Sequence, residues 1–316
     1  MQTLLEKTRA YGLVKKEELQ GELGHAYLLL FDDPRNLKTA LKTFVKPFFP
    51  CLEKLSERID NETFSDCLFF PSEGKKFTVE DAETIAEEST LKPVEGEKKA
   101  FVIADFAEAT PAAQNKLLKL LEEPPEGVVF FLGATTSYPV LSTVLSRVKI
   151  LDIPPFSARE IEECLSRIYA DKYTQADIEL CAMACDGVLG SAQNMLEGGD
   201  YKSLVDEAFA LCSATTKELP VLVKKIGDTK RKKELLSLIR IVWRDALVIK
   251  GVGAAKISLR SEKERLNKVA EKYTLPALVY AQEAISKAER ELFFNANFPQ
   301  CLEILIASVR TQNERI

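Results

Sequence analysis

The first half of the chain carries five short, almost uniformly apolar runs, separated by stretches with helical spacing. Central strands of a parallel sheet are covered on both faces, so they appear as continuous apolar runs rather than alternating ones. The pattern predicts a doubly wound α/β fold built on a five-stranded parallel sheet. The predicted strands are Ala26–Phe31, Cys67–Phe70, Ala100–Ala104, Val128–Ala134 and Val148–Ile153.

Helix start signals lie between these runs. Asp33-Pro34 and Thr110-Pro111 each place a side chain that accepts a backbone hydrogen bond before a proline at the first helical position. Two helices are therefore predicted to begin there.

After Pro154-Pro155 the pattern becomes helical throughout. Ser157 with Glu160, and Thr174 with Asp177, have the spacing of capping boxes, and Gly198-Gly199 indicates a helix end. Further predicted helices are Lys230–Lys250 (stopped by Gly251), Ser261–Tyr273, Leu275–Glu291 and Phe298–Arg310. The sequence thus predicts an α/β domain over 1–155, a small helical domain over 156–205 and a helical bundle over 206–316.

Composition and charge argue against some classes of function. With 316 residues, the chain is long enough for two or three domains. A net charge of −5 argues against a protein whose main task is to grip phosphate backbones, so any DNA contact is expected to be local or shared with partners. No apolar run is long enough for a membrane span, and Met1–Ala10 lacks a signal peptide's apolar centre, so a cytoplasmic location is expected.

Residues 100–153 carry the most specific motifs. Asn115–Pro125 reads Asn-Lys-Leu-Leu-Lys-Leu-Leu-Glu-Glu-Pro-Pro, and the next apolar run ends in Ala-Thr-Thr, with Ser146-Arg147 following. Together with His25–Leu28 and Asn295–Leu305, these blocks resemble the gamma and delta-prime type of subunit of the bacterial DNA polymerase III clamp loader, in the AAA+ superfamily. The resemblance covers nearly the whole chain and is weakest from about 200 to 290.

A phosphate-binding loop of the form Gly-x-x-x-x-Gly-Lys-[Ser/Thr] needs bare backbone N–H groups around the phosphates. The chain has no glycine between Gly24 and Gly74, and Phe31–Thr39 stands where the loop is expected. Lys38 and Thr39 resemble a remnant of the family's Lys-Thr pair. Asp33, as a helix cap, would put a carboxylate at the positive helix end that a phosphate would use. The sequence predicts a degenerate site, with weak residual nucleotide binding left open.

The resemblance implies further losses. The family's magnesium-binding Asp falls on Ala104, its catalytic Glu on Asp105 and its phosphate-sensing Arg on Gly190, while the sensing pair is kept as Thr135 and Thr136. Phosphoryl transfer depends on positioned metal and charge, so these losses together leave no mechanism. The chain is expected to be no enzyme and to bind no cofactor.

Arg147 is kept. The resemblance implies that it acts in trans, as an arginine finger that reaches a neighbouring subunit's ATP site; the planar and permanently charged guanidinium suits that role. The family's Cys after this Arg is Val148 here. The alternative is an ordinary solvated arginine.

No metal site is predicted. Members of the family usually hold zinc in a four-cysteine insertion between the first two strands, where this chain offers only Cys51 and Cys67. Cys181 and Cys185 lie four apart on a predicted helix and are expected to be buried thiols. The basic run Lys230–Lys233 is expected to be a solvated face, with DNA contact as the alternative.

The expected function is that of a non-hydrolysing clamp-loader subunit. The resemblance implies assembly with gamma- and delta-type subunits, and action on the sliding clamp and primed DNA through the complex. Two alternatives are an ATP-hydrolysing gamma-type subunit with an atypical phosphate loop, and a free-standing DNA-binding module, against which the acidic charge argues.

Overall fold

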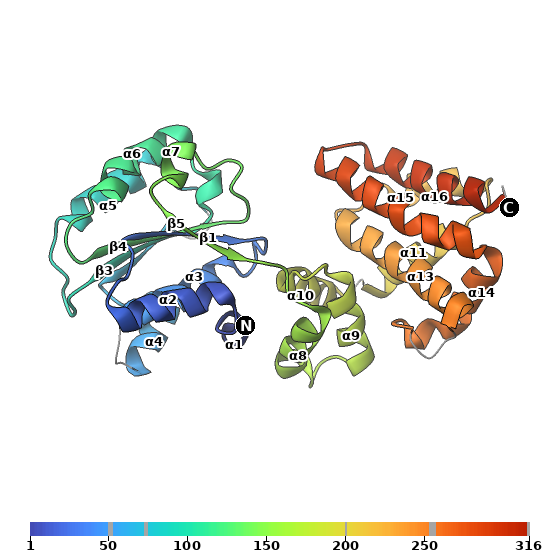
Figure 1. Ribbon diagram of the computed structural model, residues 1–316, viewed down its shortest axis with the longest axis horizontal. Helices are drawn as coiled ribbons and strands as arrows, with labels where there is room; N and C mark the ends of the chain where they lie inside the picture. The colour runs from blue at the N-terminus through green and yellow to red at the C-terminus, as the bar shows by residue number, and fades with distance from the viewer. Residues whose placement is uncertain (50–52, 73–74, 200, 253–256, 315–316) are drawn as a thin grey trace. The chain divides into compact units, whose positions relative to one another are not determined.

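The structure is a computed structural model that describes residues 1–49, 53–72, 75–199, 201–252 and 257–314. The chain divides into two compact units, Met1–Pro155 and Phe156–Ile316 (Figure 1). Each unit has its own buried core and is described separately below.

The first unit is built on a parallel sheet with strand order β2-β3-β4-β1-β5. The predicted fold class, a five-stranded parallel sheet followed by a helical region, is confirmed. The sheet is covered on both faces, which explains the uniformly apolar runs; only the edge strand β5 alternates between exposed and buried residues. The strands are β1 (Ala26–Phe31), β2 (Cys67–Phe70), β3 (Lys99–Ile103), β4 (Val128–Ala134) and β5 (Lys149–Ile153).

Helices pack on the two faces of this sheet. Figure 1 shows α5, α6 and α7 on one face and α2, α3 and α4 on the other. On the first face, Phe101 of β3 stacks on Phe130 of β4 within a buried apolar cluster. On the second, the ring of Phe48 packs edge-on against those of Tyr27 and Phe131. The helices are α1 (Gln2–Leu5), α2 (Arg9–Gln20), α3 (Leu37–Val45), α4 (Glu53–Asp60), α5 (Val79–Ser89), α6 (Pro111–Glu122) and α7 (Ser142–Leu145).

The predicted start of α6 is confirmed, since the Thr110 side chain accepts a hydrogen bond from the N–H of Ala113 and Pro111 is the first helical residue. The prediction for α3 was wrong. This helix begins at Leu37, three residues after Pro34, because Asp33–Asn36 forms a separate turn.

The second unit contains only helices within its described residues. The capping boxes of α8 at Ser157 and of α9 at Thr174 are confirmed, as is the end of α10 at Gly198, followed by Gly199 in the left-handed region with φ +67°. The helices are α8 (Ala158–Tyr169), α9 (Gln175–Ala184), α10 (Leu189–Gly198), α11 (Tyr201–Ser213), α12 (Leu219–Ile226), α13 (Lys232–Val252), α14 (Lys263–Lys272), α15 (Leu275–Phe293) and α16 (Phe298–Glu314).

Helix α13 is the centre of the second unit and packs against α11, α14 and α15. Its buried side chains include Leu238, Val242 and Trp243. The prediction that Gly251 stops this helix was wrong, because α13 runs through Gly251 to Val252; one glycine costs a helix only about 1 kcal/mol. The predicted domain boundary at residue 205 falls within α11.

No helix within the described ranges is both long and apolar enough to cross a membrane.

Candidate functional site

The carboxyl ends of the parallel strands bring most of the predicted site residues to one edge of the sheet. Leu30 of β1 pairs with Ala134 of β4, and Ile103 of β3 pairs with Leu132 of β4. The segments that follow these three strands therefore emerge side by side, at the edge where open α/β sheets bind ligands. They carry Lys38 and Thr39, Ala104 and Asp105, and Thr135 and Thr136.

The connection between β1 and α3 is a closed turn. The N–H of Asp33 donates to the carbonyl of Phe31 at 2.7 Å, and the N–H of Asn36 donates to the carbonyl of Asp33 at 3.1 Å. The Asp33 carboxylate is fully buried and accepts from the Asn36 backbone N–H at 3.1 Å and from the Asn36 side-chain amide at 2.7 Å. Asp33 thus organises the turn before the helix rather than capping its first residue. A protein carboxylate already occupies the entrance to α3.

The two glycine positions of the phosphate-binding motif fall on Asp32 and Leu37 when Lys38-Thr39 is aligned with its Lys-[Ser/Thr] pair. Leu37 is 1% exposed and packs on β4, where a methyl group added to Gly133 would lie 3.3 Å from Leu37 Cδ1. The start of α3 is therefore part of the core, and a buried side chain stands where the motif needs a bare backbone.

The ammonium group of Lys38 forms an ion pair within the chain. Its Nζ atom lies 2.7 Å from Oε1 of Glu62, and Nζ of Lys42 lies 2.8 Å from the same oxygen. Both ammonium groups also lie over the ring of Phe69, at 5.9 and 5.4 Å from its centroid. Partial burial raises the pKa of the Glu62 carboxyl, but the hydrogen bonds and charges of the two lysines outweigh burial and hold it below its ordinary value. The lysine that would contact a phosphate is neutralised by a carboxylate that the sequence pattern did not reveal.

The end of β3 offers one carboxylate. Ala104 is buried, whereas Asp105 is exposed and has a left-handed backbone with φ +51°. Desolvation raises the pKa of the Asp105 carboxyl, and the charge of Glu108 raises it further. After β4, the hydroxyl of Thr136 accepts from the N–H of Tyr138 at 3.3 Å.

Gly190 belongs to the second unit, where it is a buried residue in the first turn of α10. Within the first unit, Arg147 lies outside this cluster. Arg147 lies just before β5 begins, and hence toward the amino ends of the strands, the opposite edge from Lys38. Its Nε donates to Oε1 of Glu122 at 2.6 Å, and Nη1 donates to the carbonyl of Thr143 at 2.7 Å.

The described cysteines are buried thiols without disulfides, as expected for Cys181 and Cys185. Burial raises the pKa of Cys185 to about 12, so its thiol is inert at neutral pH. Cys51 lies outside the described residues. Within the described part of the chain, no group of three or more potential metal ligands occurs.

The lone histidine is tied to the backbone, since His25 Nε2 lies 3.1 Å from the carbonyl of Leu121. In the basic run, Lys230, Lys232 and Lys233 are exposed, while Arg231 donates to the carbonyl of Asn194 at 2.9 Å.

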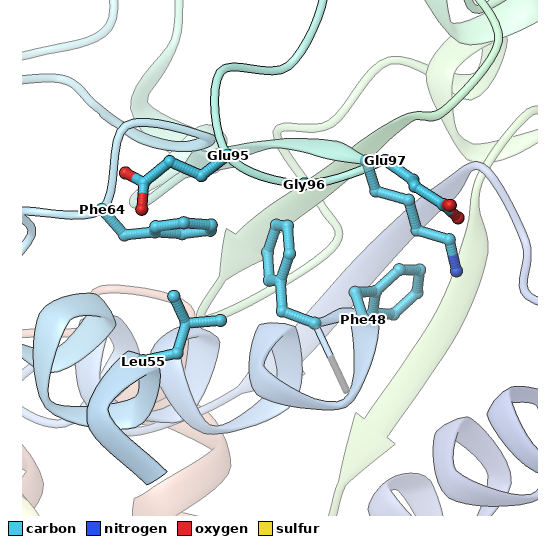
Figure 2. Close-up of a pocket in the computed structure, with 8 residues that line it drawn as sticks. Phe48, Leu55, Phe64, Glu95, Gly96 and Glu97 are labelled. Carbon is cyan, nitrogen blue, oxygen red and sulfur yellow. The ribbon is translucent and has the colours of Figure 1, made fainter. Parts of the chain in front are cut away.

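A cavity of about 330 Å³ lies away from the predicted site residues. Figure 2 shows its apolar wall, formed by Phe48, Leu55 and Phe64, and its rim, formed by Glu95–Glu97. The buried carboxylate of Asp66 holds this rim by accepting from the N–H groups of residues 94, 95 and 96 at 2.6 to 3.0 Å. None of the predicted site residues lines this cavity.

Comparison with known proteins shows which protein family and which proteins the chain is similar to. Residues 6–157 match the family model described as DNA polymerase III, delta subunit. Subunit tau of Bacillus subtilis DNA polymerase III is 24% identical over 311 residues, which cover 87% of this chain and 55% of that protein. Subunit delta-prime of the same organism is 27% identical over 164 residues, which cover 49% of this chain and 48% of that protein. The chain thus spans about half the length of these two relatives.

Among solved structures, a gamma subunit-related protein of Thermotoga maritima aligns with 97% of this chain and 100% of its own, at 17% identity and a TM-score of 0.41. The matches to tau and gamma subunits extend over both units, and the match to the delta-prime subunit covers about half of the chain. By the match over residues 6–157, the first unit of the chain belongs to the family described as DNA polymerase III, delta subunit.

Proposed function

We propose that this chain is a non-hydrolysing, delta-prime-like subunit of a DNA polymerase III clamp loader. In this role it assembles with ATP-binding gamma-type and with delta-type subunits in the cytoplasm. Through the complex it acts on the sliding clamp and on primed DNA during replication.

The observation that carries the proposal is the closed, glycine-free connection between β1 and α3. A triphosphate is held by several backbone N–H groups that point into one loop, together with a lysine and a metal ion. Here the N–H groups of Asp33 and Asn36 donate within the turn. Leu37 is packed into the core and Lys38 is paired with Glu62. The backbone donors and the lysine are thus both engaged within the chain at this one connection.

The replaced residues at the other strand ends support the same proposal. Ala104 has no oxygen with which to bind magnesium through its side chain, and Gly190 has no side chain to sense a phosphate. Thr135 and Thr136 remain at the end of β4, but the magnesium-binding Asp and the phosphate-sensing Arg that would act with them are replaced. An ATP-hydrolysing gamma-type subunit would need each of these functions restored by other residues.

The proposal gives Arg147 its role in trans. The guanidinium of Arg147 lies toward the amino ends of the strands, away from the degenerate site of its own chain, and is partly exposed, so it lies where another chain can reach it. Arginine fingers contribute about 10³ to 10⁵ in rate at the site they serve.

The test is ATP turnover by the reconstituted complex. Arg147→Ala should remove turnover at the one ATP site beside this subunit, while assembly measured by size-exclusion chromatography stays unchanged. Arg159→Ala is the matched control, because Arg159 is an exposed arginine that pairs with Glu163 on its own helix. Unchanged turnover with Arg147→Ala would contradict the trans role.

A further inference from the structure

We propose that Glu122 is a latch, a positioning residue that holds Arg147 against its own chain until a neighbour's nucleotide displaces it. The inference rests on the proposed function of Arg147 and adds how that arginine is regulated.

Every nitrogen of the Arg147 guanidinium donates within the chain. Nε and Nη2 both donate to Oε1 of Glu122, the former at 2.6 Å. Nη1 donates to the carbonyl of Thr143 at 2.7 Å and to the hydroxyl of Ser146 at 3.1 Å. A guanidinium holds its five N–H groups in a fixed fork. The edge formed by Nε and Nη2 is well suited to binding an anion, and in Arg147 the carboxylate of Glu122 occupies this edge. To donate that edge to a phosphate, Arg147 must release Glu122.

Local structure places both partners. Glu122 is the last residue of α6, because Glu123 leaves the helical region with φ −131° and ψ 72° and Pro124 follows. A residue before proline disfavours helical backbone, so the helix end is set by the sequence. Arg147 lies two residues after the end of the short helix α7, and its N–H donates to the carbonyl of Val144 at 2.9 Å. Helices α6 and α7 pack together, so the two side chains meet without further adjustment.

The charge arrangement also favours an exchangeable pair. Glu122 and Glu123 lie at the carboxyl end of α6, which carries partial negative charge and disfavours carboxylates. Arg147 offsets that repulsion in the isolated chain. When Arg147 moves to a phosphate, Glu122 is left facing water, since its side chain is 47% exposed, rather than being stranded in a dry interior.

The strength of the pair is suited to exchange. The side chains are 31% and 47% exposed, and pairs of this exposure shift equilibria by roughly 1.5- to 5-fold. A triphosphate carries more charge and forms charge-assisted hydrogen bonds that are stronger. Glu122 therefore withholds Arg147 in the absence of a neighbour's nucleotide and yields to it when it is bound.

The decisive variant is Glu122→Gln, which keeps the side-chain shape and removes the charge. Glu123→Gln is the matched control, because it removes the same charge one residue away and Glu123 is likewise exposed. In the reconstituted complex, Glu122→Gln should lower the ATP concentration at half-maximal turnover by about 1.5- to 5-fold. Glu123→Gln should leave it unchanged, and the double variant Glu122→Gln with Arg147→Ala should behave as Arg147→Ala alone. A higher half-saturating concentration with Glu122→Gln, or none of this change, would overturn the latch.

A second readout uses the isolated full chain. Modification of Arg147 by phenylglyoxal, followed by mass spectrometry, should be faster in Glu122→Gln than in the unaltered chain and in Glu123→Gln. Equal rates would overturn the latch while leaving the trans role intact, if Arg147→Ala still lowers turnover. A complex whose turnover does not respond to Arg147→Ala removes the proposed trans role and the latch with it.

Discussion

The Nζ atom of Lys38 lies 2.7 Å from Oε1 of Glu62, a residue 24 positions further along the chain. In a phosphate-binding loop, the lysine at this position supplies positive charge to the phosphates. Here that charge is neutralised by the chain itself, and Lys42 shares the same carboxylate at 2.8 Å. An ion pair thus joins the first turns of α3 to the segment that follows α4.

The pair predicts a pH-dependent contribution to stability. The pKa of Glu62 is lower in the folded chain than its ordinary value of 4.5. The unfolded chain therefore binds a proton at Glu62 more readily, and the stabilisation is present above pH 4.5 and is lost as the pH falls through the folded pKa. Glu62→Gln should lower the free energy of unfolding at pH 7 by about 0.5–1 kcal/mol, because the pair is partly exposed.

Urea unfolding of both proteins at a series of pH values checks this. The difference between the unaltered chain and Glu62→Gln should shrink below pH 4.5, whereas Glu57→Gln, an exposed glutamate on α4, should show little difference at any pH. A difference that stays constant from pH 7 to pH 3.5 would show that the charge of Glu62 is not responsible.

Packing of α3 on β4 predicts a second result. A methyl group on Gly133 would lie 2.7 Å from Leu41 Cδ1 and 3.3 Å from Leu37 Cδ1. Gly133→Ala should therefore lower the free energy of unfolding by about 1–3 kcal/mol through overpacking, and Leu41→Ala should lower it by about 2–5 kcal/mol through the cavity it leaves.

In the double variant, the new methyl group fills part of the cavity at Leu41, so the two losses should sum to more than the combined loss. Gly12→Ala is the control, because Gly12 lies in α2 with nothing within 4 Å of an added Cβ, and it should leave stability unchanged or raised. Strict additivity at Gly133 and Leu41 would mean that these residues do not share the contact described.

The strands could be predicted from the sequence because a sheet covered on both faces leaves a local record. Runs such as Val128–Ala134 match the observed β4 residue for residue. Helix starts with a capping side chain close in sequence, as at Thr110 and Ser157, were predictable for the same reason. The helix start predicted at Asp33 was wrong because aspartate also stabilises turns outside helices. The hydrogen bonds that Asp33 accepts from Asn36 belong to such a turn.

The candidate site was predictable only where its residues follow strands. Lys38, Asp105 and Thr135 could be placed at one edge because parallel strands end together. The carboxylates that form ion pairs with the predicted site residues could not be identified from the sequence. Glu62 meets Lys38 across 24 residues and Glu122 meets Arg147 across 25, and both contacts depend on tertiary packing that leaves no spacing signal.

The central claim is that this chain does not itself hold ATP, and calorimetric titration of the isolated full chain with magnesium and ATP tests it most directly. A gamma-type subunit that carries an intact glycine loop serves as the positive control, and Glu62→Gln shows whether releasing Lys38 creates a site. We expect no saturable heat for either form of this chain up to millimolar ATP, because the backbone after β1 is closed in both. Saturable binding at micromolar ATP, abolished by Lys38→Ala, would contradict the account.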